Sequence, residues 1–116
     1  MKTYISLKNR FEFDRVYNNK NSCGNKNLVM YICKNELNVN RLGLSISKKV
    51  GNSVVRHRIG RLIKESYRLN DTSISNGYDI VIVARTSVVG KSYQEVEGSL
   101  LHLFKLHKLL CKADYK

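Results

Sequence analysis

The fold is decided by one stretch, KKVGNSVVRHRIGRLIKESYR, which runs from Lys48 to Arg68. Asn52 or Ser53 can cap a helix, and apolar residues then recur on one helical face, which predicts a helix to about Leu69. The arc that can face a sheet consists of Val55, Ile59, Leu62, Ile63 and Ser66. The opposite arc consists of His57, Arg61, Lys64 and Arg68, with Arg56 and Arg58 at the margins of the apolar stripe.

This helix carries more positive charge than its own acids can balance. Glu65 is the only acid between Lys48 and Arg68, so few ion pairs offset the repulsion. A guanidinium group can grip two phosphate oxygens at once, and the free N–H groups at a helix start favour an anion. The pattern therefore indicates a surface for an anionic partner, against the plain alternative of a solvated helix face.

The whole chain is strongly basic. Its 116 residues carry 21 Lys and Arg against 9 Asp and Glu, a net charge of +12, and 42% of them are hydrophobic. This composition predicts one folded domain over residues 1–116. There is no apolar run long enough for a membrane span and no signal peptide, so we expect a cytoplasmic protein that contacts no membrane. Nucleic acid is favoured over anionic lipid, because the apolar stripes are committed to a core.

Residues that ligate metals are not grouped along the chain. The cysteines are odd in number and form no C-x-x-C pair, which predicts free thiols in a reducing compartment. The histidines form no metal-binding motif, and two of them, five positions apart, fall on different helical faces. We therefore predict no metal site on the protein. These residues are Cys23, Cys33, Cys111, His57, His102 and His107.

Upstream of the basic helix, the sequence predicts one helix and two strands. Asn9 and Glu12 have the spacing of a capping box, and apolar residues follow at helical spacing, so a helix is expected near 10–18. Residues 28–33 are a short run of β-formers, and residues 41–47 alternate between apolar and polar. We expect these two strands to pair as an antiparallel hairpin connected through residues 35–40.

Downstream, the sequence predicts a central strand and a third helix. Residues 78–84 are almost continuously apolar, which is typical of a strand buried on both faces. Ser92 and Glu95 have the spacing of a second capping box, and a helical apolar stripe continues to about residue 110. This order of elements predicts an α+β fold, a two-layer α-β sandwich with its helices on one face of the sheet.

The basic stretch resembles the signature of the bacterial ribonuclease P protein component, which runs roughly K-x-G-N-A-V-x-R-N-R-I-K-R-x-x-R. Ser53 stands where the family usually has Ala, and the chain departs further at His57, where Asn is usual, and at Gly60, where Lys is usual. The matching residues are Lys49, Gly51, Asn52, Val54, Arg56, Arg58, Ile59 and Arg61, with Lys64 as the basic residue after the gap.

The resemblance implies a ribosomal-protein-like fold with a four-stranded mixed sheet, helices, and a left-handed β–α–β crossover, against the usual right-handed rule. It also implies a subunit whose partners are ribonuclease P RNA and precursor tRNA. In this family the RNA subunit removes the 5′ leader, with Mg²⁺ bound mainly by the RNA. The protein itself would then carry no catalytic residue.

Two binding surfaces follow from the resemblance. The RNA subunit would contact Lys48, Lys49, Asn52, Arg56, His57, Arg58, Arg61, Lys64 and Arg68. The leader would contact Phe13, Tyr17, Tyr31 and Arg85, in a cleft between the sheet and the first helix. Aromatic rings stack on bases of any sequence, which suits leaders of many sequences. From the residues alone, the three aromatic residues are also compatible with core packing, and Arg85 with an ordinary surface position.

Two further functions fit the charge and the fold class. One is a ribosomal-type module that binds RNA without any enzyme, and the signature from Lys49 to Arg61 argues against it. The other is a DNA-binding protein that places the second helix in a major groove, but Asn52 is the only amide on its exposed arc, so base readout is thin. A self-sufficient nuclease is disfavoured, because the acids are scattered and form no carboxylate cluster for two-metal hydrolysis.

Overall fold

The chain folds as a five-stranded mixed sheet with three α-helices, and the structure, a computed structural model, describes residues 4–110. The strands are β1 (Tyr4–Ser6), β2 (Ser22–Gly24), β3 (Leu28–Lys34), β4 (Asn40–Ser45) and β5 (Tyr78–Ala84). The α-helices are α1 (Arg10–Asn18), α2 (Ser53–Asn70) and α3 (Tyr93–Leu106), and the 3-10 helices are η1 (Asp71–Ser73) and η2 (Thr86–Val88). The predicted α+β class is confirmed, with one strand more than the resemblance implied.

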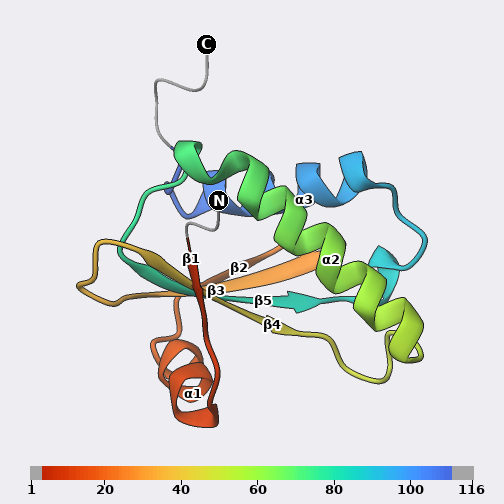
Figure 1. Cartoon of the computed structure of the whole chain (residues 1–116), viewed down its shortest axis with the longest axis horizontal. Coiled ribbons are helices and arrows are strands. Elements are labelled where there is room, and N and C mark those ends of the chain that lie inside the picture. The colour runs from red at the N-terminus through yellow and green to blue at the C-terminus, as the bar shows by residue number, and fades with distance from the viewer. Residues whose placement is uncertain (1–3, 111–116) are drawn as a thin grey trace.

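The sheet has the order β1-β4-β5-β3-β2 (Figure 1). β1, β4 and β5 run parallel, whereas β3 is antiparallel to both β5 and β2. β5 occupies the centre, as its apolar sequence predicts. The two strands that were not predicted, β1 and β2, lie at the edges and have three residues each, too few for a pattern of alternation.

The helices lie on both faces of the sheet, so the prediction that they share one face is wrong. α2 and α3 pack on each other over one face, and α1 covers the other face alone (Figure 1). The reason is the central strand, which is apolar on both sides. Ile80 and Ile82 point into the core under α2 and α3, whereas Val81 points to α1. Both faces of such a strand need a cover.

β3 and β4 are not neighbours, so the predicted hairpin pairing is also wrong. β5 lies between them, with Ile82 paired to Met30 on one side and to Leu44 on the other. The two strands do run in opposite directions, as predicted. The link over residues 35–39 is long enough to cross the roughly 10 Å that one intervening strand adds.

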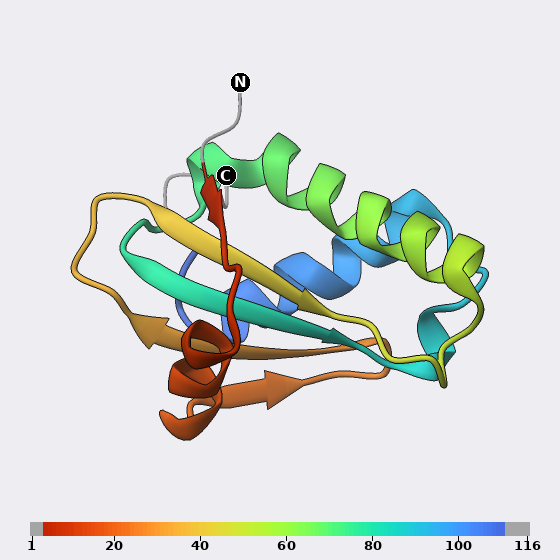
Figure 2. The ribbon, with the colours of Figure 1, turned by 60° about the horizontal axis from the view of Figure 1, so that its bottom comes forward.

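β4, α2 and β5 form the crossover that carries the basic helix. β4 and β5 are adjacent and parallel, and α2 returns the chain over the face opposite to α1 (Figure 2). Followed in that view, the connection is left-handed, as the resemblance implied. Because β4 leads directly into the turn before α2, the sheet determines where the basic helix begins.

Local sequence determines the ends of the helices. α1 and α3 both begin with the predicted capping boxes. α3 ends at Leu106 rather than near residue 110, because Lys108 adopts a left-handed backbone conformation with φ of 62°. The chain then turns back, and Leu110 forms a β-bridge with Ile74.

The inner side of α2 packs as its apolar arc predicts. Ile59, Ile63 and Ser66 are buried, and Val55 and Leu62 are half-buried. With these residues directed toward the sheet, the opposite side of the helix remains available for a ligand.

Candidate nucleic-acid interface

The turn before α2 is shaped by contacts among its own residues. The side chain of Asn52 caps the helix by accepting a hydrogen bond from the backbone N–H of Val55 at 3.0 Å. Arg56 reaches back, and its Nε donates to the carbonyl oxygen of Gly51 at 3.1 Å. A Cβ on Gly51 would lie only 2.8 Å from Val55 Cγ1, so a larger residue would disturb this turn. Asn52 and Arg56 therefore build the basic turn as well as standing at its surface.

Positive charge gathers at one end of the sheet. Lys48 and Lys49 follow β4, and Arg85 follows β5, and all three side chains are exposed. Because β4 and β5 are parallel, their carboxyl ends meet at the same edge. The first turn of α2, which contains no acidic residue, also begins there. This end of the molecule combines cationic side chains with free helical N–H groups, an arrangement that favours phosphate.

The outer face of α2 presents its basic side chains to solvent. Those that are exposed are His57, Arg58, Arg61, Lys64 and Arg68. Within residues 4–110, Arg61 and Lys64 form no hydrogen bond and no salt bridge. Arg68 differs, because its guanidinium group binds both carboxylate oxygens of Glu65, at 3.1 and 2.6 Å. Hydrogen bonding to Arg68 lowers the pKa of Glu65, so the acid stays ionised and offsets the charge of Arg68.

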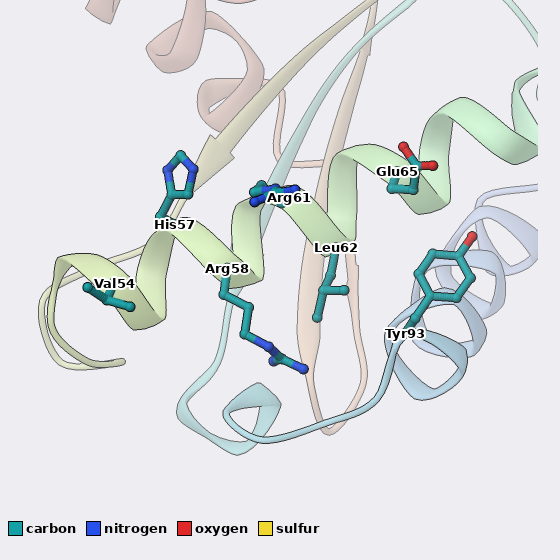
Figure 3. Close-up of a pocket in the computed structure, with 7 residues that line it drawn as sticks. All are labelled: Val54, His57, Arg58, Arg61, Leu62, Glu65 and Tyr93. Atoms are coloured by element: carbon teal, nitrogen blue, oxygen red, sulfur yellow. The ribbon is translucent and has the colours of Figure 1, made fainter.

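A groove runs between α2 and the start of α3 (Figure 3). On one side, Nη2 of Arg58 donates to the backbone oxygen of Lys91 at 3.4 Å, in the loop before α3. On the other side stands Tyr93, whose hydroxyl donates to Glu97 Oε2 at 3.1 Å. The groove is lined by Val54, His57, Arg58, Arg61, Leu62, Glu65 and Tyr93. It joins cations to an aromatic ring, the combination found in surfaces that bind single-stranded nucleic acid.

On the opposite face, three aromatic rings meet between α1 and the sheet. Tyr17 of α1 and Tyr31 of β3 pack edge to face, with ring centroids 4.8 Å apart and planes at 90°. Phe13 lies one turn earlier on α1 and rests against Gly43 of β4. All three rings are half-buried and pack around the buried Val81. The structure thus brings the three predicted aromatic residues together, with part of each ring in an apolar cluster and part open to solvent.

A buried carboxylate fastens α1 to the sheet beside these rings. Asp79 accepts hydrogen bonds from Arg41 at 2.7 Å on each oxygen, from Arg15 of α1 at 3.0 Å, and from Asn35 at 2.9 Å. Burial raises the pKa of Asp79, but the hydrogen bonds from Arg41 and Asn35 and the charges of both arginines outweigh it and lower the pKa below its usual value. Glu12 joins the network through Arg41 at 3.0 Å.

Neither this network nor the role of Tyr93 in the groove was predicted from the sequence. Asp79 interrupts the most apolar strand of the chain, and a charged residue in such a strand signals a buried partner. Its partners lie on three other segments, so their identity could not be read from spacing. Tyr93 lies at the start of the third helix, and nothing in the local sequence marks it as part of a groove.

No metal site emerges among residues 4–110, where no group of three or more His, Cys, Asp or Glu side chains could hold a metal ion. Cys23 and Cys33 are free thiols, and Cys111 lies outside the described residues. Nor does any helix in this part of the chain have the length and apolarity to span a lipid bilayer.

Comparisons with known proteins agree with one another. The family model described as Ribonuclease P matches residues 1–108. The Ribonuclease P protein component of Lachnoclostridium phytofermentans is 62% identical over 109 residues, which cover 94% of each chain. The structure of the Staphylococcus aureus RNase P protein is similar with a TM-score of 0.84 and 34% identity, covering 91% of this chain and 97% of that one. The Thermotoga maritima RNase P protein gives a TM-score of 0.81 and 28% identity, covering 87% and 96%.

Proposed function

This chain belongs to the bacterial ribonuclease P protein family, and from that premise we propose that its two faces bind two different RNAs. It is the protein subunit of the endoribonuclease that removes the 5′ leader of precursor tRNA. The face of α2 binds ribonuclease P RNA, and the aromatic cleft under α1 binds the leader. The observation that supports this division is the placement of the basic helix and the aromatic rings on opposite faces of one sheet.

The surface for the RNA subunit works through charge and hydrogen bonding to phosphate. Arg61 and Lys64, which form no hydrogen bond and no salt bridge among the described residues, supply strong phosphate donors. Asn52 and Arg56 hold the turn in which Lys48 and Lys49 stand. Binding of this kind weakens steeply as salt rises, because counterions are released from the RNA. The full set is Lys48, Lys49, Asn52, Arg56, His57, Arg58, Arg61, Lys64 and Arg68.

The surface for the leader works through stacking. The half-exposed rings of Phe13, Tyr17 and Tyr31 offer apolar faces to single-stranded bases, and stacking tolerates every base. Arg85 directly follows β5. From there it contacts the phosphate backbone of the RNA leader where the leader leaves the cleft. Mature tRNA has no leader, so this surface discriminates precursor from product.

The chain supports a cleavage reaction whose chemistry resides in its partner. Mg²⁺ bound mainly by the RNA subunit would activate the attacking water. The described residues of the protein offer no cluster of carboxylates that could bind the metal ion. The side chains of the protein bind and orient the two RNAs, and none of them acts as a catalytic residue. The chain works as one domain over residues 1–116, in the cytoplasm and without membrane contact.

Reconstitution tests this function directly. The purified chain is mixed with a bacterial ribonuclease P RNA at low Mg²⁺, and release of the 5′ leader from precursor tRNA is followed. We expect the chain to accelerate release. Binding to the RNA without acceleration would favour a purely structural RNA-binding module, and cleavage by the chain alone, freed of RNA, would overturn the proposal.

A further inference from the structure

We propose that Gly43 is a positioning residue for leader recognition, because the space left by its missing side chain seats the ring of Phe13 in the cleft. This inference rests on the proposed function of the cleft. It adds to that function a residue of the sheet that touches no RNA and acts only through the aromatic ring above it.

The geometry at Gly43 leaves no room for a side chain. A Cβ built on this residue would lie 2.6 Å from Cζ and 2.8 Å from Cε2 of Phe13, distances that real Cβ atoms do not show. It would also lie 3.1 Å from Cδ1 of Leu7, a tight contact with the flexible end of a side chain. The ring of Phe13 therefore occupies the volume that any other residue at position 43 would need.

The backbone conformation at position 43 does not require a glycine. Among the described residues, only Gly77 and Gly90 are glycines with a positive φ, so Gly43 has a conformation that other residues adopt readily. Glycine in a strand interior weakens the strand. The requirement at Gly43 is thus space for Phe13 rather than backbone freedom.

α1 cannot move away to make that space. Val16, between the two cleft rings of the helix, is fully buried, and Tyr17 packs on Tyr31 at 4.8 Å. Arg15 ties the same helix to the buried carboxylate of Asp79. A methyl group at position 43 would therefore displace the Phe13 ring toward solvent rather than lift the helix. The displaced ring would lose its place over the sheet, and bases of the leader would lose an ordered stacking partner.

The test compares Gly43→Ala, Phe13→Ala and the double variant in the reconstituted holoenzyme. Dissociation constants are measured for precursor tRNA and for mature tRNA of the same sequence. We expect Gly43→Ala to weaken precursor binding by about 5-fold or more, the loss of one stacked base, and to leave mature tRNA binding unchanged. Gly98→Ala is the matched control, because a Cβ there meets no atom within 4 Å.

The double variant tests the same contact if Gly43→Ala alone folds poorly. With the ring removed, a methyl group at position 43 no longer collides with it, so we expect the double variant to match Phe13→Ala. A further loss of discrimination in the double variant, or an equal loss for both tRNAs in Gly43→Ala, overturns the role of Gly43. If Phe13→Ala itself changes neither affinity, the leader-binding function of the cleft fails, and the role of Gly43 falls with it.

Discussion

Arg41 holds the buried carboxylate of Asp79 with two hydrogen bonds of 2.7 Å, one from Nε to Oδ1 and one from Nη2 to Oδ2. Arg15 of α1 donates to the same carboxylate at 3.0 Å. One ion-pair centre therefore joins β4, β5 and α1, the helix that carries Phe13 and Tyr17. Removing one partner of a buried ion pair leaves the other without compensation, so α1 depends on this carboxylate for its place.

The pH dependence of stability follows from this centre. The folded pKa of Asp79 is lowered, so its ionised form stabilises the fold above the unfolded value of about 3.9, and this contribution is lost as the pH falls through the folded pKa. Hydrogen bonds from backbone N–H groups also lower the pKa of Glu12 and of Glu95, which act in the same direction. We predict that the free energy of unfolding, measured by urea denaturation, declines from neutral pH to about pH 3.

Asp79→Asn isolates the contribution of the buried carboxylate. We predict that it lowers the free energy of unfolding at neutral pH by about 1–3 kcal/mol, because Arg41 loses its ionic partner. The free energy of unfolding of this variant should also decline less steeply in acid than that of the wild type, because one group with a lowered pKa is gone. Glu65→Gln, at an exposed ion pair, is the control and should leave stability almost unchanged. An acid profile identical to that of the wild type would show that Asp79 contributes nothing to it.

Most of the elements could be predicted from local sequence, whereas their arrangement could not. The apolar run at residues 78–84 correctly marks the central strand, and the capping boxes mark the starts of α1 and α3. An apolar stripe shows that a helix packs on the sheet, but not which face it covers, so the prediction that all the helices share one face was wrong. Pairing of β3 and β4 with β5 is likewise a non-local property, because it requires a strand more than thirty residues away.

Two arginines on the same face of α2, Arg61 and Arg68, should contribute differently to the affinity for ribonuclease P RNA. Arg61 has no ion-pair partner among the described residues, whereas Glu65 already offsets Arg68. We predict that Arg61→Ala weakens RNA binding more than Arg68→Ala does. Loss of one phosphate contact should also reduce the slope of the logarithm of the binding constant against the logarithm of the salt concentration by about 1. Binding titrations at several salt concentrations measure both quantities. Equal losses in the two variants would contradict the prediction, because they would show that Arg68 leaves Glu65 to bind the RNA.

The departure from the family signature at Gly60 has a structural consequence. Gly60 is buried against the sheet, and a Cβ there would lie 3.6 Å from Cδ1 of Ile46 and 3.7 Å from Cδ1 of Leu44, ordinary van der Waals distances. We predict that Gly60→Ala stabilises the protein by about 0.5–1 kcal/mol through helix propensity. Thermal denaturation measures this gain, and RNA affinity should not change. A lower melting temperature would show that the methyl group does not fit.

The part of the candidate site that depends on local sequence could be predicted. The exposed arc of α2 could be read from charge and helical spacing, and the structure exposes His57, Arg61, Lys64 and Arg68 as expected. The hydrogen bond from Arg56 to the turn, and the place of Tyr93 across the groove, depend on tertiary contacts that spacing does not encode. The same holds for the collision between position 43 and the Phe13 ring.

Leader recognition should depend on the ring of Tyr31 more than on its hydroxyl. The ring is half-exposed on the sheet and packs edge to face with Tyr17, which fixes the orientation of both rings. We predict that Tyr31→Ala weakens binding of precursor tRNA to the holoenzyme by about 5- to 150-fold, the range for losing a stacked base. Tyr31→Phe keeps the ring and should bind close to the wild-type affinity.

The comparison that decides the role of Tyr31 uses two tRNAs that differ only in the leader. Mature tRNA has no leader and so makes no contact with the cleft. The wild-type holoenzyme and the Tyr31→Ala variant should therefore bind mature tRNA with the same affinity. An equal loss for both tRNAs would indicate damage to the fold, and the melting temperature of the variant would then fall with it. If affinity for both tRNAs is retained while the melting temperature falls, Tyr31 serves the packing of α1 alone, and the leader contacts some other surface of the protein.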